Sequence, residues 1–392
     1  MRAKAAASSS PVVVAPVVGA KDFGRFIDVP YRIYRDDPHW VAPLRMEMRK
    51  LFDVKKNPFF EHAEAAFWIA TRDGAPVGRI SAQINRLHLE LHKDGAGNFG
   101  CLEAIDDPAV FGALLRQAES WLAERGMKKA LGPYTVSVND EIGVLVDGFD
   151  APPNVQMAHS PRYYAPRLEE QGYAKAMDLF AFTAFTEGGK SQALVERVER
   201  TLGKLRAEGR LTTRCLDPKR FKQDMRLALD IYNDAWRDNW GFVPVTEAEA
   251  EALIDSLSMI LKPEGVVFGM LDGKEEAFAV GIPNLNEAIA DLKGKLFPLG
   301  IVKLLWRLKM RPPTSARIML AGVKRDYRNS PLSAALISLL VGEIIQAGRK
   351  HGIKSVEMSW VLENNVPSIA LCRSAGELTK TYRLYEKALP SA

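Results

Sequence analysis

Residues 321–336, with the sequence AGVKRDYRNSPLSAAL, constrain the fold of this chain more than any other stretch. They follow the short apolar run 316–320 and lead into a long apolar pattern of helical spacing that continues to Ala347. A strand, a tight turn and a helix N-terminus favour an anion there, because the first helical N–H groups lack intrahelical partners and the helix dipole favours negative charge. Arg325 and Arg328 add positive charge. We therefore predict a phosphate-binding turn, the alternative being an ordinary strand-to-helix connection.

The composition predicts a globular chain with room for two domains of ordinary size, since its 392 residues are 47% hydrophobic. The formal net charge is only +5, and no zinc-finger, RNA-binding or basic-zipper pattern occurs, so no nucleic acid is expected as a partner. Cys101, Cys215 and Cys372 are odd in number and far apart, which favours a reducing compartment without disulfides or a zinc site. His88 and His92 have helical spacing but no third ligand, so no metal is expected.

Residues 1–20 superficially resemble a signal peptide. Their apolar part is short, rich in β-branched residues and interrupted by Pro11 and Pro16, so a first strand over residues 12–18 is favoured instead. No apolar run of about 20 residues occurs, and no membrane-spanning helix is expected. The chain is therefore predicted to be cytoplasmic, which leaves open a peripheral contact with the cytosolic face of the inner membrane.

The pattern of apolar residues and turn signals repeats in the two halves of the chain. Each half is predicted to contain a strand, helices, antiparallel strands, a strand, a long helix, a strand, a short helix and a closing strand. That order indicates an α/β fold of the α+β kind, built on mixed sheets. The turn TEGGKSQ is the clearest boundary signal. We therefore predict two domains, residues 1–188 and 189–392, that share an order of elements but not a sequence.

The turn described first resembles the acyl-CoA loop of the GNAT family of acyl-CoA-dependent N-acyltransferases. Gly322 and Val323, and then Tyr327 and Arg328, stand where that family has matching residues. The resemblance implies two tandem GNAT-like domains, with acyl-CoA as co-substrate and no metal. It also implies a donor site in the C-terminal half that comprises Gly322, Val323, Arg325, Arg328, Asn329, Ser330, Leu332 and Ser333.

The resemblance extends toward the C-terminus. Asn365 precedes Gly376 by eleven positions, which is the family's spacing over the helix near the acceptor, and Tyr385 matches the aromatic residue of the closing strand. Asn365 and Tyr385 are therefore candidate catalytic residues. The N-terminal half resembles a GNAT domain only in its order of elements, so a degenerate partner domain is expected there.

Two departures from the GNAT pattern concern the chemistry. Pro331 replaces a glycine of the pyrophosphate loop and removes an N–H group, although proline is tolerated in the first turn of a helix. Cys372 stands where the family often has the tyrosine that protonates the leaving thiolate. Cys372, Tyr382, Tyr385 or water is then expected to supply that proton. Cys372 has no neighbouring base in the sequence, so direct transfer is favoured over an acyl-enzyme.

Over its whole length the chain resembles a bacterial family of tandem GNAT-like proteins. The similar phrases are DDPHWVAPL, NPFFEHAEAAFW, SVNDEIGVLVDGFD and NDAWRDNWGFVP. The bacterial ceramide synthases, which acylate the amine of a sphingoid base, are similar to this group. The resemblance thus implies a lipid amine as the acceptor. The alternatives are a soluble amine or a protein amine, a non-catalytic acyl-CoA-binding protein, and an acyl carrier protein as the donor.

A basic segment gives separate support for a lipid, since nine cations occur between residues 293 and 325 without a carboxylate. Residues 300–310 predict an amphipathic helix within it. Its apolar stripe is Ile301, Leu304, Leu305 and Leu308, and its basic stripe is Lys303, Arg307 and Arg311. Such a helix is typical of peripheral contact with an anionic membrane, here through residues 300–311. The alternatives are a helix packed on its own core and a basic surface that attracts the phosphates of CoA.

N-acyl transfer needs a neutral amine, and a general base helps because an alkyl amine has a pKa of about 10. Glu357, in SVEMSW, is the first candidate base in the C-terminal half. Asp140 and Glu141, with Asn139, are predicted to line an acceptor groove between the domains, and His159 is a further candidate base. The structural alternatives are an exposed strand carboxylate for Glu357, an Asx-type turn for residues 139–141 and a packing role for the histidine.

Four more residues are candidates for substrate contact. Asn233, Asn239 and Trp240 lie in the aromatic segment NDAWRDNWGF, which is predicted to shape a substrate mouth, and Trp306 suits a lipid interface. Aromatic segments of this density also occur as plain packing, and that alternative applies to the first three.

Overall fold

The computed structural model describes residues 10–258, 260–328 and 330–390. The chain divides into two compact units. Unit 1 contains the described residues up to Met177, with Leu292–Lys295 and Tyr382 onward, and unit 2 contains Asp178–Asp291 and Leu296–Thr381. The division falls inside two strands, β7 (Ala174–Phe185) and β13 (Glu377–Ala388). A functional boundary near residue 188 stays a prediction.

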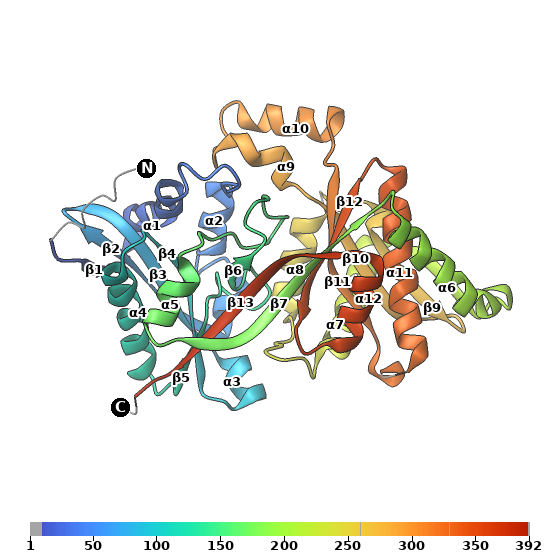
Figure 1. The fold of residues 1–392 in the computed structure, drawn as a ribbon, viewed down its shortest axis with the longest axis horizontal. Helices are drawn as coiled ribbons and strands as arrows, with labels where there is room; N and C mark the ends of the chain where they lie inside the picture. The colour runs from blue at the N-terminus through green and yellow to red at the C-terminus, as the bar shows by residue number, and fades with distance from the viewer. Residues whose placement is uncertain (1–9, 259, 329, 391–392) are drawn as a thin grey trace. The chain divides into compact units, whose positions relative to one another are not determined.

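Unit 1 contains a mixed sheet with helices, as Figure 1 shows in blue and green. Its strand order is β1-β2-β3-β4-β5-β13, in which only the pair β4 and β5 is parallel, and β6 pairs with β13. The elements are β1 (Val13–Pro16), α1 (Gly19–Ile33), α2 (Arg45–Leu51), η1 (Pro58–Glu61), β2 (Ala63–Arg72), β3 (Ala75–Asn85), α3 (Arg86–His92), β4 (Ala96–Ala104), α4 (Pro108–Ala123), β5 (Lys129–Gly132), β6 (Val144–Asp147) and α5 (Tyr164–Glu170).

Unit 2 repeats this arrangement with the strand order β7-β12-β11-β10-β9-β8, in which only β11 and β12 are parallel (Figure 1). Its elements are α6 (Gly189–Ala207), β8 (Leu211–Cys215), η2 (Pro218–Arg220), α7 (Phe221–Trp236), α8 (Glu247–Leu257), η3 (Pro263–Gly265), β9 (Val266–Leu271), β10 (Lys274–Pro283), α9 (Asn286–Ile289), η4 (Ala290–Leu292), α10 (Gly300–Met310), β11 (Ser315–Val323), η5 (Arg325–Tyr327), α11 (Pro331–Lys350), β12 (Ser355–Leu362) and α12 (Val366–Ala375). The predicted mixed α/β class is confirmed.

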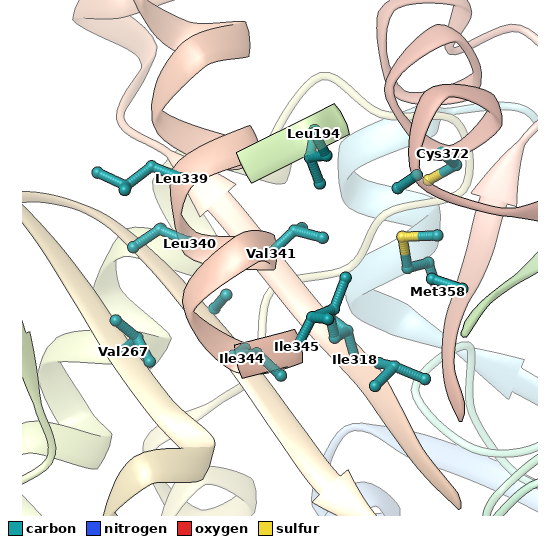
Figure 2. Close-up of a cluster of buried hydrophobic side chains, with 14 of the residues drawn as sticks. Leu194, Val267, Ile318, Leu339, Leu340, Val341, Ile344, Ile345, Met358 and Cys372 are labelled. Carbon is teal, nitrogen blue, oxygen red and sulfur yellow. The ribbon is translucent and has the colours of Figure 1, made fainter. Parts of the chain in front are cut away.

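Helix α11 organises the core of unit 2. Leu339, Leu340, Val341, Ile344 and Ile345 project from it into an apolar cluster of the unit. Figure 2 shows them around Ile318 of β11 and Met358 of β12, with Leu194, Val267 and Cys372 from three other elements. Among the described helices, α11 is long and apolar enough to cross a membrane by length and composition, and half of it is buried inside the protein. Its apolar length is thus explained by the core that it fills.

Candidate active site

The two parallel strands of unit 2 separate halfway along their length. Their pairing runs from Ser315 and Ser355 to Ile318 and Met358, whereas β11 continues to Val323 and β12 to Leu362. Each strand also shifts register at that level against its other neighbour. Where neighbouring strands separate, their facing backbone groups no longer pair with each other, so an extended ligand can bind along them.

A buried polar chain lies where the strands separate. Val356 and Met358 face the α11 core, so Glu357 and Ser359 face the opposite side of the sheet. Ser359 Oγ donates to Glu357 Oε1 at 2.7 Å and accepts from Arg317 Nε at 3.0 Å. Glu357 is directly opposite Arg317 in the ladder, and all three side chains are buried. The structure thus brings the predicted base to the point of strand separation.

The environment changes the acid strength of this carboxyl. Burial raises the pKa of Glu357 above its ordinary value of 4.5, and the hydrogen bond from Ser359 and the charges of Arg317 and Lys380 oppose that shift only in part. A carboxylate with a raised pKa is a stronger base than an exposed one, and its pKa is closer to the pH at which an enzyme works. The exposed strand position considered for Glu357 is therefore wrong, because the residue is buried.

Trp360 follows on the same strand. The guanidinium of Arg317 lies 4.9 Å from the centre of its indole ring. Trp360 Nε1 is buried and has no hydrogen-bond partner among the residues that the structure describes. A buried donor without a partner is uncommon in proteins, and it indicates a position at which a ligand oxygen can bind.

Gly322 and Val323, predicted to contact the donor, also have packing roles at the end of β11. A Cβ on Gly322 would lie 2.9 Å from the Cβ of Ala235, so glycine allows α7 to approach the strand closely. Val323 belongs to the apolar core. Trp236 Nε1 donates to the carbonyl oxygen of Ala321 at 2.9 Å, which fastens α7 to the same strand end.

The two arginines of the turn bind carboxylates of their own unit. Arg325 Nε contacts Asp234 Oδ1 at 2.9 Å, and the Arg325 backbone N–H donates to the same carboxylate at 2.8 Å. Arg328 pairs with Asp238 and donates to the Ala235 carbonyl oxygen at 2.8 Å. These pairs are partly exposed, so a phosphate can compete for the arginines. The two arginines thus add the expected positive charge to the turn, and each is already paired with a carboxylate.

The start of α11 uses some of its own donors. Ser330 is the N-cap, and its Oγ accepts from the Ser333 N–H at 3.1 Å, while Pro331 occupies the first helical position. The Ser330 N–H donates to Tyr327 O at 3.2 Å. Leu332 packs against the core, and Asn329 lies outside the described residues. The predicted helix N-terminus is therefore present, lacks an N–H group at Pro331 as expected, and already uses the N–H groups of Ser330 and Ser333 within the turn.

Other candidates of unit 2 have structural partners. Asn365 is the N-cap of α12 and accepts from the Ser368 N–H at 3.2 Å. Asn233 bonds both backbone groups of Val245 through its amide, at 3.1 and 3.3 Å, which shapes the loop after α7. Asn239 and Trp240 are half-buried in that loop.

Cys372 lies in the core beside Met358 (Figure 2). Burial raises the pKa of its thiol to about 12. The thiol therefore stays protonated near neutral pH, and a nucleophilic thiolate is disfavoured at this position. Trp306, by contrast, is half exposed on α10.

The remaining candidates belong to unit 1. Asp140 accepts from the Ser137 N–H and from Ser137 Oγ, both at 2.9 Å, so its carboxylate has partners within the turn, although these bonds run back to residue 137 and not forward as in the Asx-type turn considered above. Asn139 and Glu141 flank it in the same turn. His159 Nε2 lies 2.8 Å from Asp37 Oδ2. Tyr385 is buried, and its hydroxyl donates to Glu169 Oε1 at 3.0 Å. The donor turn and these residues are thus parts of different units.

Unit 1 also contains a parallel strand pair, β4 and β5. The backbone edge beyond their paired residues is covered by a segment of the same chain. The Tyr134 N–H donates to Phe99 O at 2.9 Å, and Gln83 Nε2 donates to the carbonyls of Tyr134 and Val136. A Cβ at Gly100 would lie 1.4 Å from the Tyr134 oxygen. The segment after β5 therefore lies along β4, where a ligand would otherwise bind.

The sequence did not identify several residues of this site. Arg317 is one of the nine cations of the basic segment, but it is buried. Ser359 and Trp360 do not belong to any of the sequence motifs described above. The available signal was the arginine itself, a charged residue inside the apolar run SARIML. Among the described residues, no group of three or more His, Cys, Asp or Glu is placed to hold a metal ion.

Comparison with known proteins gives full-length similarities. No family model matches the chain. It is 44% identical over 384 residues to the bacterial ceramide synthase of Caulobacter vibrioides, covering 97% of this chain and 99% of that protein. It is 38% identical over 382 residues to Protein YghO of Escherichia coli, covering 96% and 95%.

Solved structures confirm the predicted fold. A tandem GNAT protein from the clavulanic acid biosynthesis pathway matches with a TM-score of 0.54 at 11% identity, covering 97% of this chain and 99% of that one. A GCN5-related N-acetyltransferase from Sphaerobacter thermophilus matches with a TM-score of 0.52 at 13% identity, covering 97% of each chain. The tandem GNAT-like fold expected from the sequence is therefore correct.

Proposed function

This chain belongs to the family of the bacterial ceramide synthase, and from that premise we propose that it is an N-acyltransferase acting on a sphingoid base. The acyl group, most simply a long chain, comes from acyl-CoA, and the product is a ceramide. The relative at 44% identity supports the acceptor class, and the tandem GNAT fold supports acyl-CoA as donor.

One observation carries this proposal: β11 and β12 separate beside the buried Glu357, and β11 leads directly into the turn before α11. The open strand edges suit the extended pantetheine arm of CoA, whose amides can pair with backbone groups. The helix N-terminus then lies at the phosphate end of the ligand. An acyl donor bound in this way brings its thioester to the level of Glu357.

Each reacting group has a residue assigned to it. Glu357, ionised, accepts the proton of the attacking amine, directly or through one water. Trp360 Nε1 donates to the thioester oxygen as negative charge develops on it. The C–N bond forms, the C–S bond breaks, and the CoA thiolate takes a proton from solvent. Ser359 and Arg317 act as positioning residues, because they hold the Glu357 carboxyl in place.

The turn before α11 provides only part of what a binding site for the pyrophosphate of CoA needs. The α11 N-terminus and the arginines Arg325 and Arg328 suit a pyrophosphate. Pro331 supplies no N–H, and Asp234 and Asp238 already bind the arginines. Binding therefore requires the two arginines to exchange carboxylates for phosphates, which makes the affinity for CoA sensitive to these aspartates.

The location follows from the substrates. We expect the enzyme in the cytoplasm, where acyl-CoA is available, in peripheral contact with the cytosolic face of the inner membrane, where a lipid amine resides. Residues 300–311 are the contact segment. Acyl carrier protein is the alternative donor, since its acidic surface could bind the same basic segment.

Purified protein tests the proposal with palmitoyl-CoA and sphinganine. Released CoA thiol is measured continuously, and the amide product is identified by mass spectrometry. We expect product that requires both substrates and the intact chain. Turnover of a soluble amine or a protein amine without turnover of sphinganine would replace the acceptor, and turnover only with acyl carrier protein would replace the donor. Binding of acyl-CoA without any turnover would leave a non-catalytic binding protein.

A further inference from the structure

Helix α10 presents an unusual concentration of exposed apolar side chains. The structure describes all of α10, and none of its residues is buried. Of the fourteen large apolar residues that are exposed in the described part of the chain, six fall within positions 297–310, two just before α10 and four on it, each between 50% and 77% exposed. We call them the apolar face of α10: Phe297, Leu299, Val302, Leu305, Trp306 and Met310. Single exposed apolar residues are normal, whereas such a group marks an interaction site.

The helix is attached to unit 2 by its other side. Lys303 and Arg307 pair with Asp291, and Arg307 Nη1 also donates to the Ala288 carbonyl oxygen at 2.9 Å. Ile301, Leu304 and Leu308 are half-buried. The prediction that the stripe of Ile301, Leu304, Leu305 and Leu308 faces a membrane is therefore wrong for all of these residues except Leu305. The other members of the stripe face inward, and two of the predicted basic residues hold the helix to the protein.

Positive charge flanks the apolar face at both ends. Lys295 precedes it, and Lys309 and Arg311 lie at its C-terminal end, all of them exposed. The Arg311 guanidinium lies 5.5 Å from the centre of the Trp306 ring. No carboxylate occurs between residues 292 and 325. An apolar face with a tryptophan and flanking lysines or arginines is complementary to an anionic bilayer, whose acyl chains lie beneath a layer of phosphates.

We propose that the apolar face of α10 docks this protein on an anionic phospholipid bilayer. Phe297, Leu305 and Met310 enter the acyl region, Trp306 lies at the interface, and Lys295, Lys309 and Arg311 contact lipid phosphates. The inference rests on the proposed function only in that a lipid amine is delivered at a bilayer. Docking is measured without turnover, so its failure and a failure of acyl transfer can be told apart.

The test is sedimentation of the full chain with vesicles of phosphatidylcholine alone or mixed with phosphatidylglycerol. One variant removes apolar contact, L305S/W306S/M310S, and another reverses charge, K295E/K309E/R311E. Lys303 and Arg307 are kept, since their loss would detach the helix from Asp291. Leu91→Ser, at a 50% exposed residue of unit 1, is the matched control. Circular dichroism verifies that each variant is folded.

We expect the wild-type chain and Leu91→Ser to bind the anionic vesicles more tightly than the neutral ones. Each basic residue near an anionic surface contributes about fivefold in affinity, so loss of three such residues costs on the order of 100-fold, and the charge variant should lose at least that much because its carboxylates are also repelled. The apolar variant should lose about tenfold or more. The blue shift of tryptophan fluorescence on binding should shrink in Trp306→Phe.

Three results would overturn the proposal. The first is equal vesicle binding by the wild-type chain and the apolar variant. The second is a lipid-free dimer that the apolar variant disrupts, which would make this face an interface between copies. The third is a complex with acyl carrier protein that depends on the apolar face and excludes vesicles. If docking fails while sphinganine in detergent is still acylated, only the docking surface is wrong.

Discussion

Ser359 stands two residues after Glu357 on β12 and donates a hydrogen bond to its carboxylate at 2.7 Å. Both side chains lie on the side of the sheet opposite the α11 core, at the level where β11 and β12 separate. Ser359 Oγ also accepts a hydrogen bond from Arg317, and all three side chains are buried. The Glu357 carboxyl is therefore held in one orientation. This arrangement makes Glu357 the most specific residue at which to test the proposed chemistry.

Replacing Glu357 by glutamine keeps the shape of the side chain and removes the base. General-base catalysis contributes about 10²- to 10⁴-fold, so we expect kcat to fall within that range while the KM for acyl-CoA changes little. The measurement is steady-state release of CoA with sphinganine. Glu377→Gln, at an exposed residue, is the matched control and should keep full activity. An unchanged kcat for Glu357→Gln would require another base.

The raised pKa of Glu357 also predicts a pH dependence of stability. The folded protein holds this proton to higher pH than the unfolded chain, since burial disfavours the carboxylate. The stabilisation is therefore fully present below the unfolded value, near 4.5, and is lost as the pH rises through the folded value. Glu357→Gln remains neutral, so its Tm relative to the wild type should increase as the pH rises from the unfolded pKa to the folded pKa of Glu357 and stay constant above it. A Tm difference that is independent of pH would contradict the raised pKa.

The indole N–H of Trp360 is predicted to act in the transition state. Removal of a donor to a developing oxyanion costs on the order of 100-fold in kcat, so Trp360→Phe should lower kcat by about that factor with little change in KM. Trp121→Phe makes the same chemical change in unit 1 and serves as a control. A large rise in KM with kcat preserved would mean that Trp360 only packs against the substrate.

The aspartates that bind the turn arginines should weaken the binding of CoA. In Asp238→Asn, Arg328 loses a competing carboxylate, and an exposed ion pair is worth up to about 1 kcal/mol, so the Kd for CoA should fall about two- to fivefold. Arg328→Ala should raise the Kd. Isothermal titration measures both, and the gain should shrink at high salt because exposed charges are screened. Glu199→Gln removes one carboxylate partner of Arg206 on α6 instead and should leave the Kd unchanged.

Local features of this fold were predictable from the sequence. Thr246 with Glu249 three residues later is the sequence pattern of a capping box, and α8 begins with both hydrogen bonds of that motif. The turn after β11 was located from its apolar flanks, and residues 300–310 form the expected helix. Such features depend on neighbours within a few residues, so short sequence windows contain them.

The candidate site was less predictable, because it depends on contacts distant in the sequence. Arg317 and Ser359 are 42 residues apart, and the pairing of Arg325 with Asp234 spans 91. Which face of α10 is exposed is decided by the ion pairs of its basic residues with Asp291. Asp291 lies outside residues 300–310, so the helical pattern of these residues does not reveal the contact. Periodicity predicts that a helix has two faces, but the tertiary contacts decide which of them is covered.

Cys372 provides the last prediction, because it separates direct transfer from an acyl-enzyme. Its thiol is buried with a pKa raised to about 12, so little thiolate forms near neutral pH. Cys372→Ala should therefore keep kcat within about twofold and lose about 1 kcal/mol of stability from the cavity. Iodoacetamide should alkylate the exposed Cys215 first and reach Cys101 and Cys372 only on unfolding. A collapse of kcat in Cys372→Ala with an unchanged Tm, together with a trapped thioester on the protein, would favour the acyl-enzyme.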